Sequence, residues 1–96
     1  MKLERVNRPD VVEYAASITV LQHGDPRNIV ASVYWDDQPG VTPGWAYSFS
    51  KVSRGGPLEG PGEKPISKRA GPKRLARALL KALEWEGLTL MARRRG

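Results

Sequence analysis

The sequence PKRLARALLKALEWE, residues 72–86, predicts one long helix in this chain of 96 residues. Proline suits the first helical turn, most of the other residues are strong helix formers, and Gly87 is placed to end the helix. At helical spacing, the apolar side chains fall within one arc and the basic ones within another. The apolar arc holds Leu75, Ala76, Leu79, Leu80 and Leu83, and the basic arc holds Lys73, Arg74, Arg77 and Lys81. We therefore expect the leucines to cover another layer and the cations to face solvent.

Three stretches upstream of this helix have the period of two that is typical of half-buried β-strands: 12–20, 29–35 and 45–52. Turn formers fill residues 23–28, so the first two stretches should form a hairpin, and the Pro-Gly pairs of residues 36–44 indicate a connecting loop. The order predicts an α+β fold, in which a three-stranded antiparallel sheet is followed by a C-terminal amphipathic helix packed on one face. Residues 88–92 are expected to form either a short fourth strand or a packed tail.

Residues 53–71 hold five glycines and three prolines, a composition that disfavours both helix and strand. We expect a flexible loop there, and loops of this length are commonly either functional or disordered. The chain has the length of one small domain, so we expect a single domain over residues 1–96 that ends in a basic tail, residues 93–96.

The composition argues against several classes of function. Because the chain has no cysteine, it cannot form a disulfide, a thiol nucleophile, a cysteine-ligated zinc site or an iron-sulfur cluster. His23, the single histidine, falls in the predicted turn, and no serine-nucleophile or phosphate-loop motif is present. We therefore predict no enzymatic activity, no catalytic residues, no metal site and no cofactor. No apolar run is suited to a signal peptide or a membrane span, so we expect a cytoplasmic protein without a membrane partner.

The net charge of +6 is concentrated near the C-terminus. Residues 1–63 carry six basic and eight acidic residues, whereas residues 64–96 carry ten basic and two acidic ones. Such a cluster favours a negatively charged partner, namely nucleic acid, with DNA and RNA undecided, or an acidic protein surface. The candidate nucleic-acid-binding residues are Lys64, Lys68, Arg69, Lys73, Arg74, Arg77, Lys81, Arg93, Arg94 and Arg95.

Two other interpretations of the cluster stay open. Basic side chains on an exposed helix can serve solubility alone. The second alternative is a non-enzymatic protein-binding module, a phage-type or regulatory inhibitor that docks on an acidic surface of a larger assembly.

The helix start Lys73-Arg74-Leu75-Ala76-Arg77, after three strands and a glycine-rich loop, resembles the later part of a double-stranded-RNA-binding domain. The last helix of that family begins K-K-x-A-K. AP2-type domains and the arm-binding domains of some integrases are similar in their βββα order. The resemblance implies that Lys73, Arg74 and Arg77 contact phosphates.

The aromatic residues allow two roles. Trp45, Tyr47 and Phe49 alternate along the third stretch, so they could stack on bases if they were exposed. We favour a core position, because the helix needs an apolar surface to cover. Trp85 lies off the apolar arc near the helix end, so we expect it to be partly exposed and available to a partner.

Overall fold

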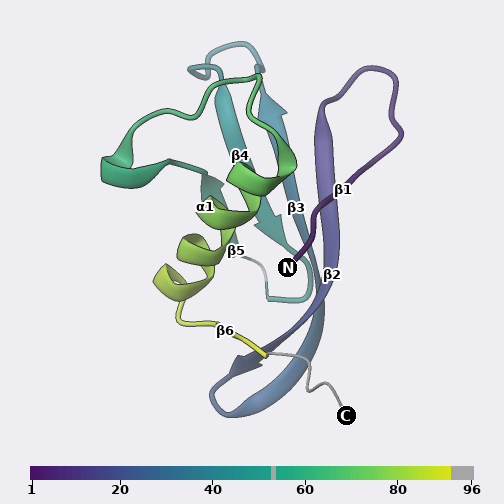
Figure 1. The fold of residues 1–96 in the computed structure, drawn as a ribbon, viewed down its shortest axis with the longest axis vertical. Helices are drawn as coiled ribbons and strands as arrows, with labels where there is room; N and C mark the ends of the chain where they lie inside the picture. The colour runs from purple at the N-terminus through teal and green to yellow at the C-terminus, as the bar shows by residue number, and fades with distance from the viewer. Residues whose placement is uncertain (53, 92–96) are drawn as a thin grey trace.

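The computed structural model describes residues 1–52 and 54–91, in which one helix lies against one face of an antiparallel sheet (Figure 1). The α+β class and the C-terminal helix are therefore confirmed, but the sheet has six strands rather than three. The elements are β1 (Glu4–Arg5), β2 (Glu13–Gln22), β3 (Asp25–Asp36), β4 (Gly44–Phe49), β5 (Arg54–Pro57), the 3-10 helix η1 (Pro61–Glu63), α1 (Pro72–Trp85) and β6 (Thr89–Leu90).

The sheet follows the order β1-β2-β3-β4-β5, and β6 joins the outer edge of β2 beyond β1. Its longest ladder is the β2–β3 hairpin, whose two-residue turn has positive φ at His23 (52°) and Gly24 (83°). That pattern fits the right-handed twist of the strands. The predicted turn over residues 23–28 is therefore too long, because Asp25 and the residues after it already pair with β2. Pro26 is tolerated there because β4 pairs with β3 only from Ala31 onward.

The glycine- and proline-rich segment is more ordered than its composition suggests. Residues 54–57 form β5 and residues 61–63 form η1, so the prediction of a loop without regular structure is wrong for these residues. Leu58 and Ile66 are each only 4% exposed, and the indole nitrogen of Trp45 donates a hydrogen bond to the carbonyl of Ser67 at 2.9 Å. These contacts fasten the segment to the rest of the domain. That it is flexible in solution stays a prediction.

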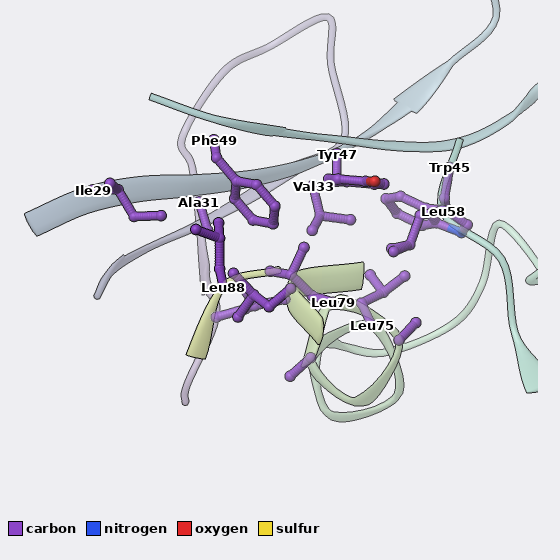
Figure 2. Packing of buried hydrophobic residues seen from close by; sticks show 14 of the residues in the cluster. Ile29, Ala31, Val33, Trp45, Tyr47, Phe49, Leu58, Leu75, Leu79 and Leu88 are labelled. Atoms are coloured by element: carbon purple, nitrogen blue, oxygen red, sulfur yellow. The ribbon is translucent and has the colours of Figure 1, made fainter. Parts of the chain in front are cut away.

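The core lies between the sheet and the leucine arc of α1, as Figure 2 shows. Leu75, Leu79 and Leu83 are at most 1% exposed. They pack against side chains from the two central strands and the flanking segments, among them Ile29, Ala31, Val33, Trp45, Tyr47, Phe49, Leu58 and Leu88. The core role of the aromatic row is therefore confirmed. Leu80 lies at the margin of the arc and is 36% exposed.

The end of α1 determines where the chain goes next. The backbone N–H of Gly87 donates to the carbonyl of Glu84 at 3.0 Å, and that of Leu88 to the carbonyl of Leu83 at 2.9 Å. With Gly87 at a φ of 76°, this is a Schellman motif, in which glycine is favoured because it carries no Cβ. Leu88 is 2% exposed and leads into β6. Of the two alternatives for residues 88–92, a strand is observed over Thr89–Leu90, and residue 92 lies outside the described part of the chain.

Candidate nucleic-acid interface

The basic arc of α1 forms one wall of a groove of about 570 Å³. The opposite wall is the segment around η1, which contributes Glu59, Gly60 and Pro61. The buried side chains of Ile66 and Ala78 contribute apolar surface to the groove. The helix contributes four cations, which are Lys73, Arg74, Arg77 and Lys81.

The position of the four cations follows from the way the helix docks. Because the leucine arc is buried against the sheet, the opposite arc must face outward, and all four basic side chains are exposed. Lys73, Arg77 and Lys81 follow one another at intervals of four residues, which is about 6 Å along the helix axis. Lys73, Arg77 and Lys81 therefore form a row of positive charges at regular intervals along the helix.

Few carboxylates lie near these four cations. Within residues 1–52 and 54–91 the ion pairs are Arg8–Glu13 and Arg54–Glu86, and neither involves a cation of the groove. Glu59 is the one carboxylate among the residues that line the groove, while Glu84 is exposed on the same helix. The groove thus carries a clear excess of positive charge, which favours an anionic ligand.

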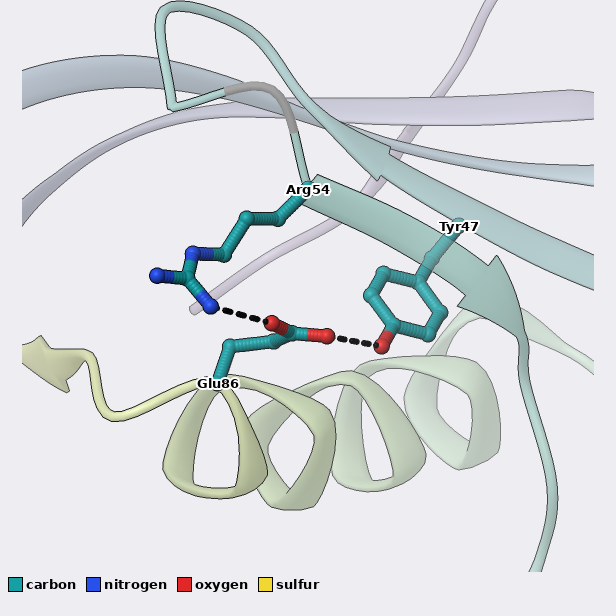
Figure 3. Close-up of polar contacts among 3 residues, drawn as sticks. All are labelled: Tyr47, Arg54 and Glu86. Carbon is teal, nitrogen blue, oxygen red and sulfur yellow. Dashed lines mark hydrogen bonds and ion pairs between the residues drawn. The ribbon is translucent and has the colours of Figure 1, made fainter.

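Glu86, the other carboxylate at the end of α1, is bound by two side chains of the sheet (Figure 3). The hydroxyl of Tyr47 donates to Oε1 of Glu86 at 3.0 Å, and the guanidinium of Arg54 donates to Oε2 at 3.0 Å. Burial, together with the hydrogen bond and the charge of Glu86, raises the pKa of Tyr47 from 10.0 to about 12. These bonds link β4 and β5 to the helix end, so they help to fix which arc of α1 faces outward.

Three further predicted site residues, Lys64, Lys68 and Arg69, are not among the residues that line the groove. The ammonium group of Lys68 lies 5.5 Å from the ring centroid of Trp35, at the end of β3. Lys64 is exposed in the turn that its carbonyl closes with the N–H of Gly60, and the N–H of Arg69 donates to the hydroxyl of Ser67. Arg93, Arg94 and Arg95, with the whole tail 93–96, lie outside the described residues.

Sequence reasoning missed the second wall of the groove. Its residues, Glu59 to Ile66, belong to the segment that was expected to be a loop without structure. The usable signal was the pair of isolated aliphatic residues, Leu58 and Ile66, in an otherwise small and polar stretch. Both are buried, which holds the segment beside the helix.

Trp85 is exposed as expected, and strongly so, at 87%. It occupies the last turn of α1, four residues after Lys81, and so continues the row of Lys73, Arg77 and Lys81 by one turn. The other aromatic side chains are all buried or half-buried. Trp85 is thus the one aromatic side chain classed as exposed among the residues that the structure describes.

Other surfaces offer a weaker basis for a site. A hollow of about 970 Å³ lies at the outer edge of β2, but its charges are mixed, with Lys2 and Arg5 beside Glu4. In the described ranges, no three side chains of the metal-binding types come together. Nor does the described part of the chain contain a helix of the length and apolarity that crossing a bilayer requires.

Comparisons with protein-family models, with curated proteins and with solved structures found no significant match to this chain. The resemblance to double-stranded-RNA-binding, AP2-type and integrase arm-binding domains therefore stays a prediction.

Proposed function

We propose that the protein is a small nucleic-acid-binding protein and that the groove beside α1 holds the phosphate backbone. The observation that carries the proposal is the row of exposed cations, Lys73, Arg77 and Lys81 with Arg74 beside it, along one wall of a single groove. Lysine and arginine side chains that neutralise phosphates release condensed counterions, which is the main source of affinity without sequence preference. Phosphate contacts of this kind position the nucleic acid, and they carry no base information.

The cations outside the groove would extend the same interface. Lys64 lies in the chain segment that forms the second wall. Lys68, Arg69 and the arginines of the tail add positive charge to the same third of the chain. In this proposal they raise the rate and strength of association, because attraction between unlike charges acts over about a Debye length.

The test replaces Lys73, Arg77 and Lys81 together with glutamine and measures binding to labelled oligonucleotides over a series of salt concentrations. Glutamine is nearly as good a helix former as lysine or arginine, and all three positions are exposed, so the fold should be retained. Affinity should fall, and the slope of log affinity against log salt should flatten by roughly 2 to 3 units for duplex DNA, about 0.9 per lost contact.

A matched control removes the same amount of charge elsewhere. The exposed residues Lys2, Arg27 and Lys51 lie away from the groove, so their replacement with glutamine should leave most of the slope in place. Equal losses in the two triple variants would mean that net charge, rather than the groove, determines binding. A folded groove variant with wild-type affinity and slope would refute the proposal.

The second candidate is a protein-binding module that docks on an acidic protein surface, in the manner of a phage-type or regulatory inhibitor. The exposure of Trp85 favours it, because tryptophan and arginine are the residues most enriched at the energetic centres of protein interfaces. The same salt series separates the two candidates. A protein that binds neither DNA nor RNA at low salt would favour this second function.

A further inference from the structure

We propose that the ligand of the groove is single-stranded nucleic acid and that Trp85 is the platform on which an unpaired base stacks. This inference rests on the proposed function and narrows it to one class of nucleic acid. Trp85 is 87% exposed, and none of the aromatic contacts among the residues that the structure describes involves it. Such exposure is unfavourable in an isolated protein, and a planar ligand would relieve it.

The position of Trp85 on the helix connects it to the cations. Lys73, Arg77, Lys81 and Trp85 recur every four residues, so each side chain lies one turn further along the helix and about 40° further around its axis, and Trp85 follows just beyond the residues that line the groove. A strand whose phosphates contact the lysine and arginine positions would therefore reach the indole at the end of the row. Interfaces for single strands combine a positively charged groove with an aromatic side chain for stacking, which is the combination that this helix face presents.

The surface of the groove also favours an unpaired strand. Pro61, on the wall opposite the cations, is exposed and apolar, while the buried side chains of Ile66 and Ala78 border the groove. A single strand can place its phosphates on the cations and a base face on Pro61 or on the indole. In a duplex the base faces are stacked on one another, so only phosphates, sugars and base edges would meet the protein.

The aromatic residues elsewhere leave this role to Trp85. Trp45, Tyr47 and Phe49 are buried beneath α1, at 3%, 6% and 3% exposure, so the face of the sheet that α1 covers cannot act as a stacking surface. Tyr14 and Tyr34 are half-buried on the strands β2 and β3, and neither lines the groove. Trp35 is half-buried and makes an edge-to-face contact with Trp45, with ring centroids 5.6 Å apart. A base that stacks on this protein next to the row of cations would therefore stack on Trp85.

The test measures the binding of a labelled oligothymidine, an oligouridine and a duplex of equal length at two salt concentrations. The proteins are the wild type, Trp85→Ala, Trp85→Phe and, as a matched removal of an exposed apolar side chain from the same helix, Leu80→Ala. Stacking on an aromatic side chain typically contributes a factor of about 5 to 150 in affinity. Trp85→Ala should therefore weaken binding to single strands by about tenfold or more, while its binding to the duplex changes by less than about twofold.

Four further results are expected. The salt slope should be the same in Trp85→Ala as in the wild type, because the indole carries no charge. Trp85→Phe should recover part of the lost affinity, and Leu80→Ala should bind like the wild type. Single strands should also quench tryptophan emission in the wild type more strongly than in Trp85→Ala, since stacking brings a base against the indole.

The outcomes separate this inference from the proposed function. If the wild type binds nucleic acid but Trp85→Ala binds single strands equally well, or if the duplex binds more tightly than the single strands, the stacking inference is wrong and the phosphate groove survives. If the wild type binds none of the three oligonucleotides at low salt, the proposed function fails and the inference fails with it. An acidic protein would then be the remaining candidate partner.

Discussion

The hydroxyl of Tyr47 donates a hydrogen bond of 3.0 Å to Oε1 of Glu86, which links the middle of the sheet to the C-terminal cap of α1 (Figure 3). The side chain of Tyr47 is 6% exposed, so its hydroxyl has little access to water and depends on this partner. Arg54 binds the other oxygen of the same carboxylate, also at 3.0 Å. One glutamate therefore fastens the helix to two neighbouring strands, β4 and β5.

We first predict a loss of stability at high pH that depends on Tyr47. Its pKa is raised from 10.0 to about 12 in the folded protein, so the folded state holds the phenolic proton more tightly than the unfolded state does. The resulting stabilisation is fully present below about pH 10 and disappears as the pH rises toward 12. The difference of about two pKa units corresponds to roughly 2 to 3 kcal/mol in the free energy of unfolding.

Urea denaturation at pH 9 and above pH 11 would measure this loss, with Tyr47→Phe as the comparison. The variant should be about 1 kcal/mol less stable at neutral pH, because the hydrogen bond to Glu86 is gone. Between the two alkaline pH values it should lose less stability than the wild type, which still has Tyr47 to titrate. Parallel losses in the two proteins would show that Tyr47 does not govern the alkaline transition.

Second, we predict that two adjacent leucines of α1 differ in the stability that is lost when each is replaced with alanine. Leu79→Ala should destabilise the protein by about 2 to 4 kcal/mol, because Leu79 is fully buried between α1 and the sheet. Leu80→Ala removes the same atoms one residue further on, where the side chain is 36% exposed, and should cost less than about 1 kcal/mol. Chemical denaturation of both variants checks the prediction, and equal costs would contradict the packing of this helix face.

Third, we predict that two adjacent glycines of β5 respond differently to alanine. A Cβ atom at Gly55 would lie 2.6 Å from the carbonyl oxygen of Tyr47 and 3.3 Å from Cα of Ser48, both of them backbone atoms of β4. A Cβ atom at Gly56 would meet nothing closer than 3.9 Å. Gly55→Ala should therefore cost about 1 to 3 kcal/mol, while Gly56→Ala should stay within about 0.5 kcal/mol of the wild type. A neutral Gly55→Ala variant would mean that β5 can move away from β4 without cost.

Fourth, we predict that the burial of Ile66 protects the second wall of the groove from proteolysis. Ile66 is 4% exposed and anchors the segment around η1 to the core. Glu63 of the same segment is exposed, so a glutamate-specific protease should cut after Glu63 when the segment detaches from the core. Ile66→Ala should raise the initial rate of this cleavage by about tenfold or more, since the lost burial lowers the free energy of local opening. Val41→Ala, which truncates a side chain that is 49% exposed in another loop, serves as the control and should leave the rate unchanged.

The larger elements could be predicted because their signals are local. The helix over residues 72–85 combines a proline start, a glycine stop and a leucine arc, and the observed helix agrees with the expected one to within one residue. The three predicted strands were located by their alternating side chains, although β4 ends at Phe49 rather than at Val52. The short strands have no such signal, since a period cannot be recognised in the two to four residues of β1, β5 and β6.

The glycines of residues 53–71 show why composition alone led to the wrong prediction of a loop at β5. Glycine is depleted in strands because it offers no side chain to pack, and this argues for a loop. In β5 the missing side chain is what permits pairing, because Gly55 lies against the backbone of β4. Only the position of the neighbouring strand distinguishes the two cases, and that position is not a property of the local sequence.

The candidate site also has a part that the sequence predicts and a part that depends on the tertiary structure. The sequence by itself determined the chemistry of one wall, because the spacing of Lys73, Arg77 and Lys81 and the separation of the basic from the leucine arc are properties of a single helix. Only the tertiary structure decided that residues 59–66 stand opposite these cations and that Glu86 turns to Tyr47 and Arg54. The physical reason is that these features depend on contacts between segments far apart in the chain, and such contacts are determined by the packing of the whole core.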